Sequence, residues 1–202
     1  LLTPPLILWI TFTESYFADN VLQSSGVLSV LPSSISIISI YSIGWARILL
    51  THLHSSFSAL YAGMIMEING FIIESVVVGS VGTNCYIVHK KDSEHCFVVD
   101  PGDSGDKIAN YIRDQKMILD HILLTHGHFD HIQGVRDLKN AIRCEICVLD
   151  VEKELLSDAH MNVSAMTGRP EELEADIWLH DGQQFESAGI TIKVIHTPGH
   201  TK

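Results

Sequence analysis

The stretch Thr125-His126-Gly127-His128-Phe129-Asp130-His131 decides how the rest of this 202-residue sequence is interpreted. Three histidines and one aspartate lie within six consecutive residues. Imidazole nitrogens and carboxylate oxygens are ligands that suit zinc, iron or manganese. A single histidine usually satisfies a local hydrogen bond, but packing does not explain a group this dense after the apolar run Ile122-Leu123-Leu124. The pattern therefore predicts a metal site.

The spacing divides the possible ligands into two groups. In an extended chain the side chains alternate, so His126, His128 and Asp130 would share one face. His131 breaks this alternation and can join them only if the chain bends after Asp130. Residues 132–138 read as the start of a helix, so we expect a strand–turn–helix corner that carries two pairs of ligands. Two metal ions a few ångströms apart, with a shared hydroxide for hydrolysis, would suit that corner.

The sequence from residue 64 onward alternates between strand and helix patterns. Strands are expected at residues 68–78, 84–88, 96–99, 118–125, 144–149, 176–179 and 190–195, with Phe185 in further strand material. Helices are expected at residues 108–115, 131–140 and 151–157. The alternation predicts an α/β fold. The hairpins expected around residues 79–83 and 90–94 indicate a mixed sheet.

A third histidine ligand is expected close to the last residue. Pro198-Gly199 follows a β-branched strand and predicts a tight, exposed turn, from which His200 could reach the site. This signal is weak alone, but it would add a third nitrogen to the first two histidines of the cluster. His196 lies four residues before His200, back towards the strand, so we expect it to pack or to orient a neighbour.

Asp100 ends an apolar strand, and two roles fit it. Its carboxylate could accept from the ring N–H of a ligand histidine and so fix the tautomer of that ring. It could instead support the turn before Pro101. The sequence is compatible with either role.

Cys144 and Cys147 form a C-x-x-C pattern, which is often a zinc or redox signal. They belong to an apolar strand, in which side chains three residues apart point to opposite faces. The four cysteines of the sequence contain no second pair with this spacing. We therefore predict that both are buried structural thiols.

The net charge of −11 bears on the class of partner. Phosphate contacts need Lys and Arg, so an acidic chain is a poor match for nucleic acid. Bound metal ions would reverse the local field, so the charge does not exclude an anionic small substrate. We expect a small-molecule substrate and no nucleic acid.

Residues 1–63 differ in composition from the rest. They are rich in Ser, Ile and Leu and contain three Asp, Glu, Lys or Arg residues in total. The stretch 27–50 has the length of a membrane helix but is diluted by serine and interrupted by proline and glycine. We predict that residues 1–63 lie outside the catalytic domain, which would occupy residues 64–202 of a cytoplasmic protein. A membrane anchor and a folded extension are the alternatives.

Taken together, these motifs resemble those of the metallo-β-lactamase fold superfamily, and most closely its glyoxalase II-like branch of hydroxyacylglutathione hydrolase-like bacterial enzymes. The resemblance rests on residues 125–131, on Asp100-Pro101-Gly102 before them and on residues 196–201 after them, in that order. Residues 83–88 and the region 162–175 make the resemblance specific to the glyoxalase II-like branch.

The resemblance implies a fold and a site. The fold would be an αβ/βα sandwich with a mixed β-sheet, of which residues 64–202 would form the N-terminal part. The site would hold two zinc ions, with iron or manganese as alternatives. The implied ligands are His126, His128 and His200 for the first ion and Asp130 and His131 for the second. Asp130 and His131 would also be catalytic, and Asp100 would act through a ligand histidine.

The implied chemistry is hydrolysis by an enzyme. A metal-bound hydroxide would attack a thioester or a related small ester, while the metals polarise its carbonyl and stabilise the leaving group. Two other enzyme classes on this fold share the motif, namely a persulfide dioxygenase with a single iron and a nuclease. The acidic charge counts against the nuclease.

The sequence departs from the family pattern beyond His200. The family's later bridging aspartate and final histidine have no counterpart before Lys202. Three matched ligands for one ion and two for the other fall short of the four that are usual for zinc. We therefore expect a C-terminally truncated fragment that binds metal weakly and turns over little substrate, and an inactive product is a further alternative.

Overall fold

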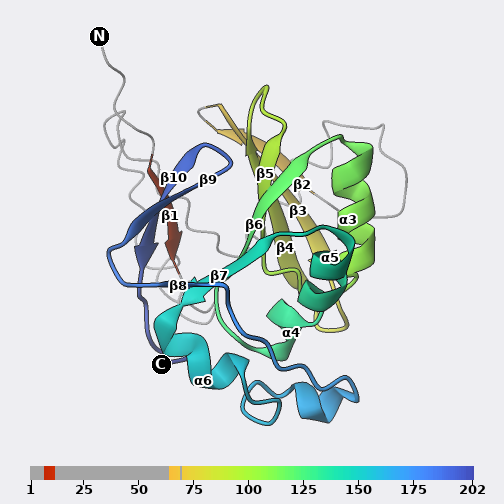
Figure 1. The fold of residues 1–202 in the computed structure, drawn as a ribbon, viewed down its shortest axis with the longest axis vertical. Coiled ribbons are helices and arrows are strands. Elements are labelled where there is room, and N and C mark those ends of the chain that lie inside the picture. Colours follow the sequence, from red (N-terminus) through yellow and green to blue (C-terminus); the bar gives the residue numbers. More distant parts are fainter. Residues whose placement is uncertain (1–6, 12–63, 69) are drawn as a thin grey trace, which may run out of the picture.

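The computed structural model of the protein describes residues 7–11, 64–68 and 70–202 (Figure 1). Most of the segment 1–63, including the stretch 27–50 considered as a membrane span, lies outside these residues. Within the part that is described, no helix combines the length and the apolar composition needed to cross a bilayer.

A seven-stranded mixed sheet forms the centre of the fold. Its strands lie side by side in chain order: β2 (Met64–Ile68), β3 (Phe71–Val78), β4 (Thr83–Lys90), β5 (His95–Val99), β6 (Ile118–Leu124), β7 (Glu145–Leu149) and β8 (Ile177–Leu179). Strands β2 to β5 pair antiparallel, whereas β5 to β8 pair parallel. The predicted α/β class and mixed sheet are thus confirmed.

A second sheet of three strands lies in the order β1, β10, β9. Strand β10 (Ile190–Ile195) pairs antiparallel with β9 (Gln184–Ser187) and parallel with β1 (Ile7–Thr11). Figure 1 shows β1, in dark red, beside β10, in blue. Strand β1 is the described part of the segment predicted to lie outside the catalytic domain. That prediction otherwise concerns residues that the structure does not describe.

The central sheet is buried on both faces. On one face lie helices α3 (Gly105–Asp114) and α5 (Val135–Ala141), which Figure 1 shows together beside the sheet, and on the other lies the second sheet. Strand β5 shows the alternation, since Cys96 and Val98 pack in the helix-side core and Phe97 and Val99 in the core between the sheets. This double burial explains why the central strands read as continuous apolar runs.

Short helical segments complete the chain between the strands. They are α4 (Phe129–Ile132), η1 (Asp150–Glu152), α6 (Lys153–Leu156) and η2 (Ser164–Thr167).

Two expected elements are divided in the structure. The strand predicted at residues 68–78 corresponds to β3, but its first residue, Ile68, ends the neighbouring strand β2, with which β3 forms a hairpin. The turn between them includes Gly70, whose φ of +82° is a conformation that glycine adopts without steric cost. The helix predicted at residues 131–140 is instead α4 followed by α5.

The break between α4 and α5 follows from a close backbone approach. The amide of Gly134 donates to the carbonyl oxygen of Pro101 at 2.9 Å. A Cβ at Gly134 would lie 2.5 Å from that oxygen, and a Cβ at Gly102 would lie 1.6 Å from the carbonyl oxygen of Asp130. The turn after β5 therefore presses directly against the segment that carries the candidate ligands.

All four cysteines are buried and unbridged. Cys144 packs in the helix-side core and Cys147 in the core between the sheets, which confirms the prediction of buried thiols on opposite faces. Burial raises the pKa of Cys144 to about 11 and that of Cys147 to about 12.

Replacing Gly102 by alanine should lower the free energy of unfolding by roughly 3 kcal/mol or more, because backbone atoms must move to admit the new Cβ. The matched control is Gly182→Ala, whose Cβ would meet nothing within 4 Å and whose φ is +75°. That control should cost only about 1–2 kcal/mol. Urea unfolding measures both values, and equal losses would contradict the close approach at Gly102.

The buried thiols should resist modification in the folded protein. A rise in the pKa of Cys144 from 9.0 to about 11 lowers its reactive thiolate fraction by about 100-fold at neutral pH. We expect Ellman's reagent to label the native protein slowly and to label all four cysteines quickly in denaturant. Rapid labelling of one native thiol would contradict the burial described above.

Candidate metal centre

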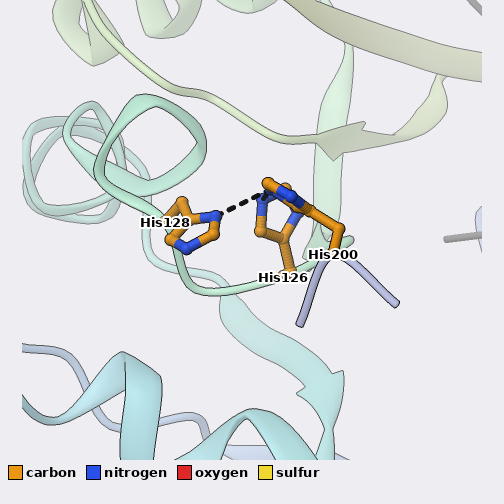
Figure 2. A group of neighbouring side chains, drawn as sticks. All are labelled: His126, His128 and His200. Carbon is orange, nitrogen blue, oxygen red and sulfur yellow. Dashed lines mark hydrogen bonds between the residues drawn. The ribbon is translucent and has the colours of Figure 1, made fainter. Parts of the chain in front are cut away.

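Three histidines from two distant parts of the chain meet at one point. His126 and His128 follow β6, and His200 follows β10. Figure 2 shows their rings turned towards one another. Nε2 of His200 lies 2.9 Å from Nδ1 of His128 and 3.1 Å from Nε2 of His126. One ligand nitrogen from each ring lies within 4.8 Å of the others.

The loop that carries two of these histidines is held closely against α6. A Cβ at Gly127 would lie 3.1 Å from the backbone nitrogen of Leu156, so a larger residue would push the loop away. Glycine at this position therefore allows the backbone on both sides of it to approach the helix.

Asp130 and His131 form a second group beside the first. Both lie in α4, which begins at Phe129. We expected the chain to bend after Asp130, but it bends before this residue, where α4 begins. Asp130 therefore does not share an extended face with His126 and His128. Nε2 of His131 lies 3.3 Å from Oδ2 of Asp130. The ring centroids of His131 and His126 are 4.1 Å apart, so the two groups are contiguous.

Asp100 combines the two roles that the sequence left open. It is 3% exposed, and its Oδ2 lies 2.9 Å from Nδ1 of His131. Its two oxygens also accept from the backbone N–H and the hydroxyl of Thr125, at 2.7 and 2.6 Å. The φ of Asp100 is +51°, a left-handed conformation that aspartate tolerates better than most residues. The carboxylate therefore supports the turn and orients the ring of His131.

The electrostatics differ between the two groups. Burial and the neighbouring imidazoles lower the pKa of His126 to about 2, which favours the neutral ring that binds metals. Burial alone would lower the pKa of His131, but the carboxylates of Asp100 and Asp130 raise it to about 10. Burial alone would raise the pKa of Asp130, but His131 and the Thr83 hydroxyl hold it well below its usual range.

Two residues that support the site, Thr83 and Glu152, were not predicted from the sequence to have this role. The hydroxyl of Thr83 donates to Oδ2 of Asp130 at 2.6 Å. The carboxylate of Glu152 accepts from the amide of Gly127 at 3.0 Å and from the hydroxyl of Thr201 at 2.5 Å. Thr83 reads as part of a turn and Glu152 as part of a short helix, so only the fold identifies their partners.

The donor set fits a divalent metal ion. Three imidazole nitrogens this close to one another match an ion with metal–nitrogen distances of about 2.0–2.1 Å. His196 is not part of the group, since its Nε2 lies 2.7 Å from the carbonyl oxygen of Lys202. The structure thus places together the three histidines predicted to hold one ion and the Asp130–His131 pair predicted to hold another. Their binding of metal stays a prediction.

A cavity opens beside the histidine group. Its lining residues include His128 and His200 together with Val151, Leu155 and Met161. The lining therefore combines two imidazoles and three apolar side chains, and Glu152, Thr201 and Lys202 complete it.

Comparisons with known proteins agree with the geometry. The family profile described as Metallo-beta-lactamase superfamily matches residues 78–202. The chain is 31% identical to the probable metallo-hydrolase YqgX of Bacillus subtilis, over 61% of this chain and 59% of that protein. It is 33% identical to a hydroxyacylglutathione hydrolase of Aeromonas salmonicida, over 63% of this chain and 43% of that protein. The chain thus spans less than two thirds of the length of each of these two curated relatives.

A solved structure of similar fold is that of BLEG-1, a B3 metallo-beta-lactamase. The two share 29% sequence identity with a TM-score of 0.59, over 64% of this chain and 63% of that chain.

Replacing His200 by alanine should weaken zinc binding by more than roughly 100-fold, the upper end of what the loss of a merely supporting residue costs. His196→Ala is the matched control, because it removes the same side chain from the same segment but outside the group. Competition with a chelating dye measures both affinities. Similar affinities for the two variants would show that His200 is not a ligand.

Proposed function

Because the chain belongs to the metallo-beta-lactamase superfamily, we propose that the protein is a metal-dependent hydrolase of small thioesters or related esters. The observation that carries the proposal is the convergence of His126, His128 and His200 beside a cavity. The hydroxyacylglutathione hydrolases among its relatives support the thioester class. The family assignment made from the sequence motifs is confirmed by the match to residues 78–202.

In this proposal the three histidines hold one divalent ion, while Asp130 and His131 hold a second. Zinc is the proposed metal, with iron or manganese as alternatives. When bound, such ions generate a hydroxide nucleophile at neutral pH and polarise a carbonyl group.

The surrounding residues keep the ligands in place. The hydroxyl of Thr83 and the ring of His131 both contact Oδ2 of Asp130, which restricts the rotation of that carboxylate. Asp100 does the same for the ring of His131. A reacting carbonyl would therefore meet groups whose positions are already set, which lowers the entropic cost of the reaction.

The cavity supports a small substrate with an apolar acyl group. Val151, Leu155 and Met161 provide an apolar wall, and His128 and His200 lie in the same lining. An acyl chain packed against the wall would bring its carbonyl towards the imidazoles. The net charge of −11 speaks against a nucleic-acid substrate.

Hydrolysis of a β-lactam is the second candidate. It is favoured by the 29% identity and the shared fold with BLEG-1. The bond broken would then be a strained amide instead of a thioester, with the same residues holding the metals.

The test is a substrate panel applied to the purified protein with zinc. It contains an S-acyl glutathione, an aryl ester and a chromogenic β-lactam. We expect slow turnover, in line with the weak metal binding expected from the sequence, with the thioester cleaved fastest. A chelator should abolish the activity and zinc should restore it. Asp130→Asn should lower kcat/KM by roughly 10–100-fold or more. Asp114→Asn, an exposed carboxylate at the end of α3, is the matched control.

Three results would contradict the thioesterase proposal. Cleavage of the β-lactam without cleavage of the thioester would favour the second candidate. One iron per chain with oxygen consumption would indicate a dioxygenase. Thioester cleavage that survives complete removal of metal would rule out the metal-dependent chemistry.

A further inference from the structure

Glu152 is a buried carboxylate that contacts both loops of the histidine group. It ends η1 and is 3% exposed. Its Oε2 accepts from the amide of Gly127, at 3.0 Å, and its Oε1 accepts from the hydroxyl of Thr201, at 2.5 Å. Gly127 lies between two of the histidines, and Thr201 directly follows the third. One side chain therefore joins two loops that are more than 70 residues apart.

The burial of this group calls for an explanation. Removing a carboxylate from water is costly unless hydrogen bonds replace the lost solvent. Among the residues that the structure describes, the buried acidic side chains are Asp100 and Glu152. Asp100 contacts His131 at the site, and Glu152 contacts the loops of the other three histidines. Both buried acidic groups thus support the same centre.

The segment around Glu152 is where the two loops are anchored. Gly127 approaches the backbone of Leu156 so closely that a Cβ would lie 3.1 Å from its nitrogen. Lys202, next to Thr201, forms an ion pair with Glu154. Glu152 also lies in the lining of the cavity beside the histidine group. Of these contacts, the pair of hydrogen bonds to Glu152 is the one that links the two loops through a single buried group.

We infer that Glu152 is a positioning residue, which holds the two loops together so that the three imidazoles are arranged before a metal ion binds. The inference rests on the proposed function, because it takes the histidine group to be a metal site. Without the link, metal binding would have to order the loops, and the cost of that ordering would lower the affinity. Supporting residues of this kind typically change metal affinity by about 10–100-fold.

The experiment measures zinc affinity by competition with a chelating dye, starting from metal-free protein. Glu152→Gln keeps the shape but replaces one acceptor by a donor, and Thr201→Val removes the hydroxyl at nearly constant volume. Each should weaken zinc binding by about 10–100-fold, and Thr201→Ser should restore it. Because both variants break one link, their effects should be less than additive in the double variant.

Glu154→Gln is the matched control. Glu154 is two residues further along and its ion pair with Lys202 reaches the same terminal segment, but both side chains are exposed. An exposed ion pair contributes little, so this variant should bind zinc as the unmodified protein does. The absorption spectrum of bound cobalt gives a second readout, and it should change in Glu152→Gln and Thr201→Val but not in Glu154→Gln.

The outcomes distinguish failure of the inference from failure of the proposed function. Unchanged zinc affinity in Thr201→Val would overturn the inference, since the link would then be dispensable. Failure of Thr201→Ser to restore the affinity would overturn it too. Should Glu152→Gln fail to fold, the two Thr201 variants decide alone. If the unmodified protein binds no zinc in a manner that depends on His126, the proposed function fails first, and the inference fails with it.

Discussion

The site depends on the parallel pairing of β5, β6 and β7 inside a sheet that is buried on both faces. In this pairing Val99 lies opposite Leu123, and Leu123 lies opposite Cys147, so the three strands end along the same edge. Polar residues follow each strand directly, at positions where the chain has left the sheet. Within the sheet these side chains would be buried among apolar residues, which is costly. Asp100 follows β5, the histidine loop follows β6, and the segment ending in Glu152 follows β7. The apolar core thus fixes where the chemistry lies.

Backbone contact then determines how closely the polar residues approach one another. Gly102 and Gly134 let the turn after β5 lie directly against α4, and Gly127 lets the histidine loop lie against α6. A side chain at any of these positions would hold backbone segments apart. The contact from Asp100 to His131 joins the two segments that Gly102 and Gly134 bring together. The positions of the candidate ligands are therefore set by main-chain packing as much as by their own interactions.

The sequence predicted the parts of this arrangement that have a local signal. The dense group at residues 126–131 identified candidate ligands, and the turn at Pro198-Gly199 identified His200. The alternation of strand and helix patterns identified the α/β fold. The sequence placed the C-x-x-C thiols correctly because alternation along a strand is a local property. The sequence interpretation missed the hairpin at Gly70. It also missed the break before α5, because that break arises from the contact of Gly134 with Pro101, 33 residues earlier in the chain. Metal binding by the candidate ligands stays a prediction.

Thr83 and Glu152 show why supporting residues are harder to find from sequence than ligands. A ligand belongs to a residue type with few common roles, and several ligands together make a recognisable pattern. A threonine in a turn or a glutamate in an acidic segment has many ordinary roles, and only its partner gives it another. The partner of Thr83 is Asp130, 47 residues away, and the partners of Glu152 are 25 and 49 residues away. Since only the fold creates these pairs, a chain could keep every motif histidine and still bind metal poorly if such a partner were lost.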